Sequence, residues 1–199
     1  MRPLLAHLAL LVVAAFAPAA PVPKETLAKF RDFYPLLPGT EWEYGVGESV
    51  VTVKVKEYAK KDGVRTGTLA TFNGETEIAT ERIRVEAKGV YRTHINATKI
   101  DPPVLILKFG IKDETEWTTK AKVGEQTVDF KFKLEGLEEV KVSAGKYRAV
   151  KVTGSGDIAG TQSEAIYHFA EGVGIVRLEY RIGENGATME LRKFTPGKE

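Results

Sequence analysis

The sequence contains no cysteine among its 199 residues. Cysteine thiolates hold structural zinc and iron–sulfur clusters, act as nucleophiles in thiol enzymes and form disulfides. The absence of cysteine therefore excludes all of these sites, and also a lipid anchor on an N-terminal cysteine. Eukaryotic secreted domains commonly use disulfides, so an exported chain without cysteine is more typical of a bacterium.

Long hydrophobic runs are also missing, except at the N-terminus. There Arg2 precedes the apolar run Leu8–Phe16, and small residues lead into Pro21. This order is typical of a secretory signal. The run is too short to span a membrane, which takes about 20 apolar residues. We expect cleavage after Ala19, removal of residues 1–19, and export of the mature chain to the periplasm or the extracellular space.

An excess of charge of one sign is the third absence. Without Arg2, the chain has 28 basic and 27 acidic side chains. Binding to nucleic acid requires an excess of lysine and arginine on one face. The composition therefore predicts no nucleic-acid partner.

Helical periodicity is limited to one short segment. Apolar residues recur at helical spacing only in Lys24–Phe33, and Pro35 and the Pro38-Gly39 pair follow. We therefore expect a short N-terminal helix and a Pro-Gly turn within residues 20–40. An antiparallel β domain is expected over residues 41–195, and a frayed tail over 196–199.

Two-residue alternation dominates the rest of the chain. In 49–58, 127–136 and 175–183, apolar side chains alternate with charged or polar ones, which indicates strands with one buried face. Weaker alternation occurs in 82–87, 90–97, 187–194 and around Trp42. Turn signals such as Asn73-Gly74 separate these segments. The spacing leaves no room for crossover helices, so roughly ten to thirteen antiparallel strands are expected.

The expected sheet must hide its apolar face. It can curl around itself, or it can wrap around the N-terminal helix. We favour a strongly curved, half-open barrel with the helix near its concave face. The alternation leaves two orientations for the segment around Gly145. Val142 has an even number and Tyr147 an odd one, so simple alternation would place their side chains on opposite faces of the sheet. Either Gly145 carries a bulge that resets the phase, or Tyr147 packs on the other face.

Few residues suggest chemistry. Gly154–Ala159 fits G-x-G-x-x-A, but a strand and not a helix follows, so a flexible hairpin loop is the better interpretation. The mature chain has two histidines. His94 is expected on the wet face with Arg92 and Asn96, and His168 is expected to be partly buried. Their spacing does not indicate a metal site.

Carboxylate pairs such as Glu138-Glu139 and Glu75/Glu77 lie beside turns or on polar faces, where solvated charge is the usual role. A glycosidase would need one carboxyl group with a raised pKa at a fixed distance from a second. The sequence also lacks a G-x-S-x-G elbow. We therefore predict no catalytic residue, no cofactor and no metal.

Aromatic residues are the remaining candidates for ligand contact. Trp42 and Tyr44 share one face of their strand, and Trp117 stands among threonines and lysines. Such residues can hold sugars or acyl chains, although they more often form core. Trp42, Tyr44 and Trp117 are our candidate ligand-binding residues.

Three motifs carry a family resemblance: Tyr34–Tyr44 (YPLLPGTEWEY), Val142–Val152 (VSAGKYRAVKV) and Tyr167–Val176 (YHFAEGVGIV). Together they resemble a β-rich domain of unknown function in uncharacterised exported bacterial proteins, common in planctomycete-like genomes. More remotely, the chain is similar to the half-open barrels of the periplasmic lipoprotein-localisation factors. The resemblance implies a fold and a compartment, and the remote one implies binding of acyl chains.

Three functions are consistent with these observations. The first is a non-catalytic exported domain that binds a lipid or other amphipathic small molecule, or an envelope protein, on the concave side of the sheet. The second is a structural or interaction module of the cell envelope that has no ligand. The third is a hydrolase of polysaccharide or ester, which would need two converging carboxylates or a histidine beside a serine.

Overall fold

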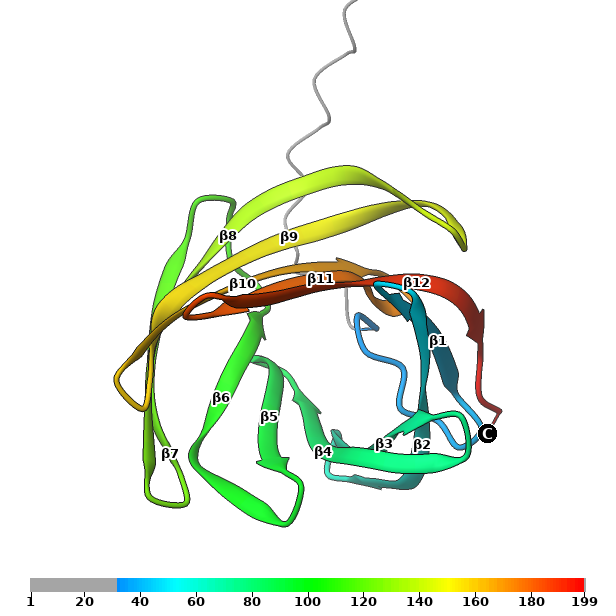
Figure 1. Ribbon diagram of the computed structural model, residues 1–199, viewed down its shortest axis with the longest axis horizontal. Helices are drawn as coiled ribbons and strands as arrows, with labels where there is room; N and C mark the ends of the chain where they lie inside the picture. Colours follow the sequence, from blue (N-terminus) through cyan, green and yellow to red (C-terminus); the bar gives the residue numbers. More distant parts are fainter. Residues whose placement is uncertain (1–31, 199) are drawn as a thin grey trace, which may run out of the picture.

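The computed structural model describes residues 32–198, and these form twelve β-strands (Figure 1). The strands are β1 Glu41–Val46, β2 Ser49–Lys61, β3 Val64–Asn73, β4 Thr76–Glu86, β5 Gly89–Ile95, β6 Thr98–Lys108, β7 Glu116–Val123, β8 Gln126–Val142, β9 Gly145–Ile158, β10 Thr161–Ala170, β11 Gly174–Ile182 and β12 Asn185–Thr195. Each strand pairs antiparallel with the next along the chain, as the alternation predicts.

The sheet closes on itself. β1 pairs with β12 from Glu41 opposite Thr195 to Val46 opposite Met189, which completes a barrel. The prediction of a half-open barrel was therefore wrong. Closure joins the first and last strands of the sheet, so no local sequence pattern predicts it. It also removes the exposed edges that an open sheet would leave.

Of the predicted N-terminal helix, the structure describes only the last two residues. Its segment, Lys24–Phe33, lies outside the described residues except for Asp32 and Phe33, which are not helical. No helix occurs in residues 32–198. Consequently this part of the chain holds no helix that is long and apolar enough to cross a membrane. The predicted signal segment lies outside the described residues.

The two ends of the barrel differ. At the end that we call the closed end, where β1 begins, residues 32–40 enter the ring of strands beside β1 (Figure 1). Gly172 N donates to Asp32 O (2.8 Å), and Leu36 is fully buried where β3 has Gly67. A Cβ atom at Gly67 would lie 2.9 Å from Leu36 Cδ2. We call residues 32–40 the plug.

The C-terminal tail helps to hold the plug. Gly197 N donates to Thr40 Oγ1 (3.1 Å), and Lys198 N donates to Pro38 O (3.1 Å). The tail, expected to be frayed, is thus hydrogen bonded through residue 198. The opposite end, which we call the open end, has short turns between strands, and the described chain places no comparable segment across it.

β8 and β9 continue past the barrel wall as a two-stranded hairpin. Their pairing runs on to Val142 opposite Gly145, with Val140 opposite Tyr147. Residues directly opposite each other share a face, so Val140 and Tyr147 lie on the same side. A two-residue turn at 143–144 makes this possible, and no bulge at Gly145 is needed. We call residues 137–148 the flap.

Candidate functional site

The inner face of the barrel changes from buried to exposed along its length. Near the closed end, inner residues such as Val85 and Val90 are buried. Midway along β4 and β5, Glu81 and Arg92 keep 24% and 23% of their side-chain surface exposed. Solvent therefore reaches a charged pair that belongs to the inner face.

Strand register places these side chains inside. Glu81 lies opposite Leu69 on β3, which is buried, and opposite Ile95 on β5. On the other side of the ring, Leu178 lies opposite Tyr167, whose phenol is close enough to influence Arg92. Because side chains alternate along a strand, residues 180 and 182 continue the inner face of β11.

Three exposed apolar side chains lie at the open end. Ile95, Tyr180 and Ile182 are 40%, 39% and 44% exposed and end the inner faces of β5 and β11. We call the surface formed by Glu81, Arg92, Ile95, Tyr180 and Ile182 the open inner face.

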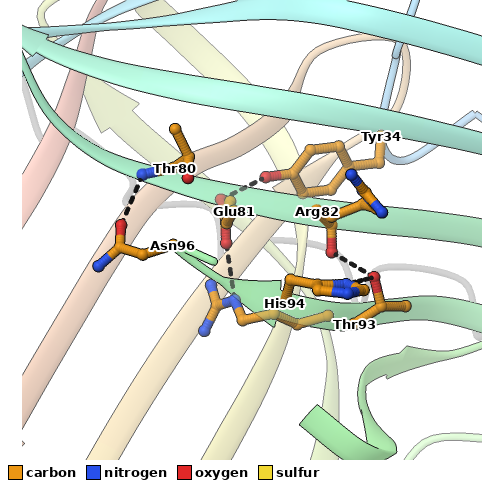
Figure 2. A network of polar contacts seen from close by, with 8 residues as sticks. Tyr34, Thr80, Glu81, Arg82, Thr93, His94 and Asn96 are labelled. Atoms are coloured by element: carbon orange, nitrogen blue, oxygen red, sulfur yellow. Dashed lines mark hydrogen bonds and ion pairs between the residues drawn. The ribbon is translucent and has the colours of Figure 1, made fainter. Parts of the chain in front are cut away.

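Polar contacts link the charged pair to the plug (Figure 2). Arg92 Nε donates to Glu81 Oε2 at 2.7 Å, and Tyr34 Oη approaches Glu81 Oε1 at 3.5 Å. The first bond is charge-assisted, whereas the second is long and weak. One carboxylate oxygen of Glu81 is therefore only weakly satisfied and can accept a further hydrogen bond.

Electrostatics fixes the protonation states around this pair. The carboxylate of Glu81 raises the pKa of Arg92 further above its ordinary value, so the guanidinium stays charged. Burial, and secondarily Glu81, raises the pKa values of Tyr34 and Tyr44. Both phenols therefore remain neutral hydrogen-bond donors at physiological pH. The group can position a polar ligand atom but lacks a nucleophile poised beside a base.

The aromatic residues predicted from the sequence lie in the core. Trp42, Tyr44 and Trp117 are all buried. Each donates its polar hydrogen to a backbone carbonyl: Trp42 Nε1 to Val173 O (2.6 Å), Tyr44 Oη to Ile175 O (2.8 Å) and Trp117 Nε1 to Leu105 O (2.9 Å). Their contact with a ligand remains a prediction.

Trp117 also has a structural role in the barrel wall. β6 and β7 pair only at Ile100 opposite Val123 and Asp101 opposite Lys122. Beyond that point the indole N–H reaches Leu105 O on β6, which satisfies a carbonyl that the ladder leaves unpaired. Stacking on Phe132 then fixes the ring (centroids 5.6 Å apart).

Sequence reasoning missed Glu81 and Arg92. Glu81 has the same parity as the buried Ile83 and Val85, which is a usable signal. Arg92 was placed with His94 on the wet face, and this was wrong. A bulge at Thr93 puts Arg92 opposite Ile83, while His94 stays opposite Arg82 on the outer face.

The polar groups around the bulge stabilise the wall instead of forming a site. Thr93 Oγ1 donates to Arg82 O at 3.1 Å (Figure 2). Asn96 N donates to Thr80 O (2.7 Å), and Asn96 Oδ1 accepts from Thr80 N (2.9 Å). The Asn96 side chain thus replaces a missing strand partner for Thr80.

The other histidine lies under the flap. His168 is 4% exposed, and its Nε2 is 2.8 Å from Glu138 Oε1. Glu139, the neighbour of Glu138, pairs instead with Lys146, on the face of the flap that is turned away from the barrel wall. These two carboxylates therefore point to opposite faces and cannot act together on one bond. Among residues 32–198, no three metal-ligating side chains gather in one place.

The glycine motif is part of a strand. Gly154 and Gly156 lie within β9, and the turn comes later, at Ala159-Gly160. A Cβ atom at Gly154 would lie 2.7 Å from the Phe132 ring. The expected flexible loop was wrong: these glycines let aromatic side chains of β8 pack closely against β9.

Solved structures share this fold. A candidate lipoprotein from Parabacteroides distasonis ATCC 8503 matches with a TM-score of 0.56 and 14% identity, over 83% of this chain and 99% of its own. A candidate exported protein with a YmcC-like fold from Bacteroides fragilis NCTC 9343 matches with a TM-score of 0.57, 11% identity and the same coverage. Both are bacterial, but neither comes from a planctomycete. No protein-family model and no curated protein sequence matches the chain.

Proposed function

We propose that the mature chain is an exported, non-catalytic barrel that binds a small apolar or amphipathic molecule against its open inner face. The observation that carries this proposal is the exposure of Glu81 and Arg92 on the inside of the barrel. A charged pair inside a barrel is costly unless it is solvated or meets a polar partner. The apolar rim formed by Ile95, Tyr180 and Ile182 would receive the apolar part of the ligand.

Barrel size supports the proposal. Eight strands give an interior that side chains fill or that holds one small ligand, and the diameter grows with strand number. Twelve strands form a wider ring, and the plug enters it from the closed end as far as Glu81, which Tyr34 Oη approaches. The structural neighbours support export, since one is described as a candidate lipoprotein and the other as a candidate exported protein.

A binding titration tests the proposal. The mature chain is titrated with a fluorescent medium-chain fatty acid, and we expect saturable 1:1 uptake with a blue-shifted emission. Ile182→Lys places a charge at the mouth on the inner face and should weaken binding about tenfold or more. Val50→Lys is the matched control: Val50 is also exposed at the open end, but it lies opposite Gly45 on the outer face.

Two results would contradict ligand binding. One is the absence of saturable uptake, and the other is an equal effect of Ile182→Lys and Val50→Lys. Either result would favour the alternative, an envelope module that has no small-molecule ligand.

A further inference from the structure

The flap folds back over the outer wall of the barrel. β9 pairs with β10 only as far as Ala149 opposite Ala170. Beyond that point the flap crosses the outside of β11 and β12, and Ala144 N donates to Leu191 O (3.0 Å). Val140 and Val142 are buried beneath it. Figure 1 shows β8 and β9 as a second layer outside β10 to β12.

A hollow of about 390 Å³ lies beside the tip of the flap. Ser143 of the flap turn borders it on one side, and the outer faces of β1, β11 and β12 form its floor. Gly45, Glu190 and Arg177 lie in one row across these three strands, because they are directly opposite one another. The volume lies within the usual range for sites that bind small molecules.

A β-bulge delivers Arg192 to this hollow. Glu43 pairs with Lys193 but Tyr44 pairs with Leu191, so Arg192 is an extra residue in β12. Bulges commonly re-aim a side chain. Here the side chain lies across Gly45: a Cβ atom at position 45 would be 3.3 Å from Arg192 Cδ and 3.5 Å from its Nε.

Glycine at position 45 is explained by this side chain. Gly45 is not among the residues with positive φ, so its backbone conformation would accept other amino acids. Any larger side chain would displace Arg192. The bulge and the glycine together therefore hold one guanidinium over the hollow.

The two arginines that line the hollow differ in their partners. Arg177 Nη2 pairs with Glu190 Oε1 at 2.9 Å, but Arg177 Nε is buried and forms no hydrogen bond, with a Glu179 oxygen 3.4 Å away. Arg192 forms no hydrogen bond or ion pair with residues 32–198. Glu179 and Glu190 thus balance the charge of Arg177, and the guanidinium of Arg192 is left to pair with an anion in the hollow.

We propose that this hollow binds an anionic oxygen group, a phosphate or a carboxylate carried by a small molecule, with Arg192 as its main contact. A guanidinium presents planar, paired donors that match such groups. The hydroxyls of Ser143 and Thr188 border the same space and supply neutral donors. A lipid headgroup and a free phosphate ester share this chemistry. The site is on the outer wall, so it is independent of the open inner face.

Inorganic phosphate is the first probe. The ¹⁵N-labelled mature chain is titrated with phosphate at constant ionic strength, and the amide signals of Gly45, Gly47 and Ser143 are followed. We expect saturable shifts confined to these residues and their neighbours. Arg192→Gln should weaken binding at least tenfold, and Gly45→Ala should weaken it several-fold without any change in charge.

Arg181→Gln is the matched control, because Arg181 is an exposed arginine on β11 that pairs with Glu164 away from the flap. The proposal predicts that this variant binds phosphate like the parent. Shifts that never saturate, or an equal loss in Arg181→Gln and Arg192→Gln, would overturn it. Amide spectra of each variant confirm that the barrel is folded.

Vesicles distinguish the two sources of the group. If phosphate binds and phosphatidylglycerol vesicles capture the parent but not Arg192→Gln, the ligand is a lipid headgroup. If phosphate binds and the vesicles capture neither protein, it is a soluble anion. Both results support the site, whereas capture that is unaffected by Arg192→Gln would contradict its role in lipid contact.

Discussion

The closed and open ends of the barrel are built from the same twelve strands but have opposite interiors. At the closed end, Phe33, Leu36 and Trp42 fill the space between the strands and are almost completely buried. At the open end, inner side chains such as Tyr180 and Ile182 remain exposed. The plug supplies Phe33 and Leu36 to the closed end, and the described chain places no comparable segment at the open end.

If the open inner face binds the proposed ligand, this contrast separates stability from binding. A filled end with hydrogen-bonded indole and phenol groups can maintain the fold, and this leaves the other end free to expose apolar surface. Substitutions should therefore affect stability at the closed end and ligand uptake at the open end.

The largest expected effect compares one aromatic residue from each end. Trp42→Ala removes a buried indole that donates to Val173 O, and it should lower the free energy of unfolding by about 3–5 kcal/mol. Tyr180→Ala removes an exposed ring and should cost less than about 1 kcal/mol. Urea unfolding measures both. Equal losses would mean that the two ends do not differ in packing.

The fit of the plug is tested by a double-mutant cycle. Gly67→Ala forces a methyl group against Leu36 Cδ2 and should cost about 1–3 kcal/mol. Leu36→Ala should cost about 2–5 kcal/mol by itself. The double variant should be more stable than the sum of the two losses predicts, because alanine at 36 makes room for the new methyl group. Strict additivity would show that the plug does not contact β3 in solution.

Alkaline pH should selectively weaken the closed end. The folded-state pKa values of Tyr34 and Tyr44 lie above the ordinary value of about 10. Above pH 10 the unfolded chain therefore releases protons that the folded chain keeps. Stability is unaffected below pH 10 and falls by about 1.4 kcal/mol per pH unit for each tyrosine. Tyr44→Phe should make this fall shallower, and urea unfolding from pH 8 to 11 measures it.

The smallest effect concerns the outer wall near the open end. Partial burial lowers the pKa of His94, and the positive charges of Arg82 and Lys99 lower it further. Because the folded-state pKa lies below the unfolded one, this histidine reduces stability as the pH falls below about 6.5. Lys99→Gln should raise the His94 pKa, which NMR titration of the imidazole signals detects. An unchanged midpoint would remove Lys99 as a cause.

The sequence predicted strand content better than closure. Alternation in 49–58, 127–136 and 175–183 identified β2, β8 and β11, because apolar side chains on one face alternate there with charged or polar ones. The closing strands β1 and β12 were among those with weak patterns, since β1 has only six residues and β12 carries a bulge. Their pairing depends on the curvature of the whole sheet, which no short segment encodes.

Bulges and long-range contacts also explain what was missed at the candidate site. The bulge at Thr93 reverses the parity that placed Arg92 outside, and the bulge at Arg192 re-aims that side chain toward the flap. Neither bulge residue is a glycine or a proline, so the sequence contains no signal for an irregular strand at these positions. The aromatic residues Trp42 and Tyr44 were recognised as one face, but only the fold reveals that backbone carbonyls take their hydrogen bonds.

Cysteine accessibility tests the contrast between the ends most directly, because the chain contains no cysteine of its own. Ile182→Cys introduces a thiol on the open inner face, and Leu191→Cys introduces one on the buried inner face of β12. The rate of maleimide labelling is measured with and without the fluorescent fatty acid. We predict fast labelling at 182 that the fatty acid slows, and slow labelling at 191 that rises only on unfolding. Equal rates at the two positions, or labelling at 182 that the fatty acid leaves unchanged, would contradict an open, ligand-binding interior.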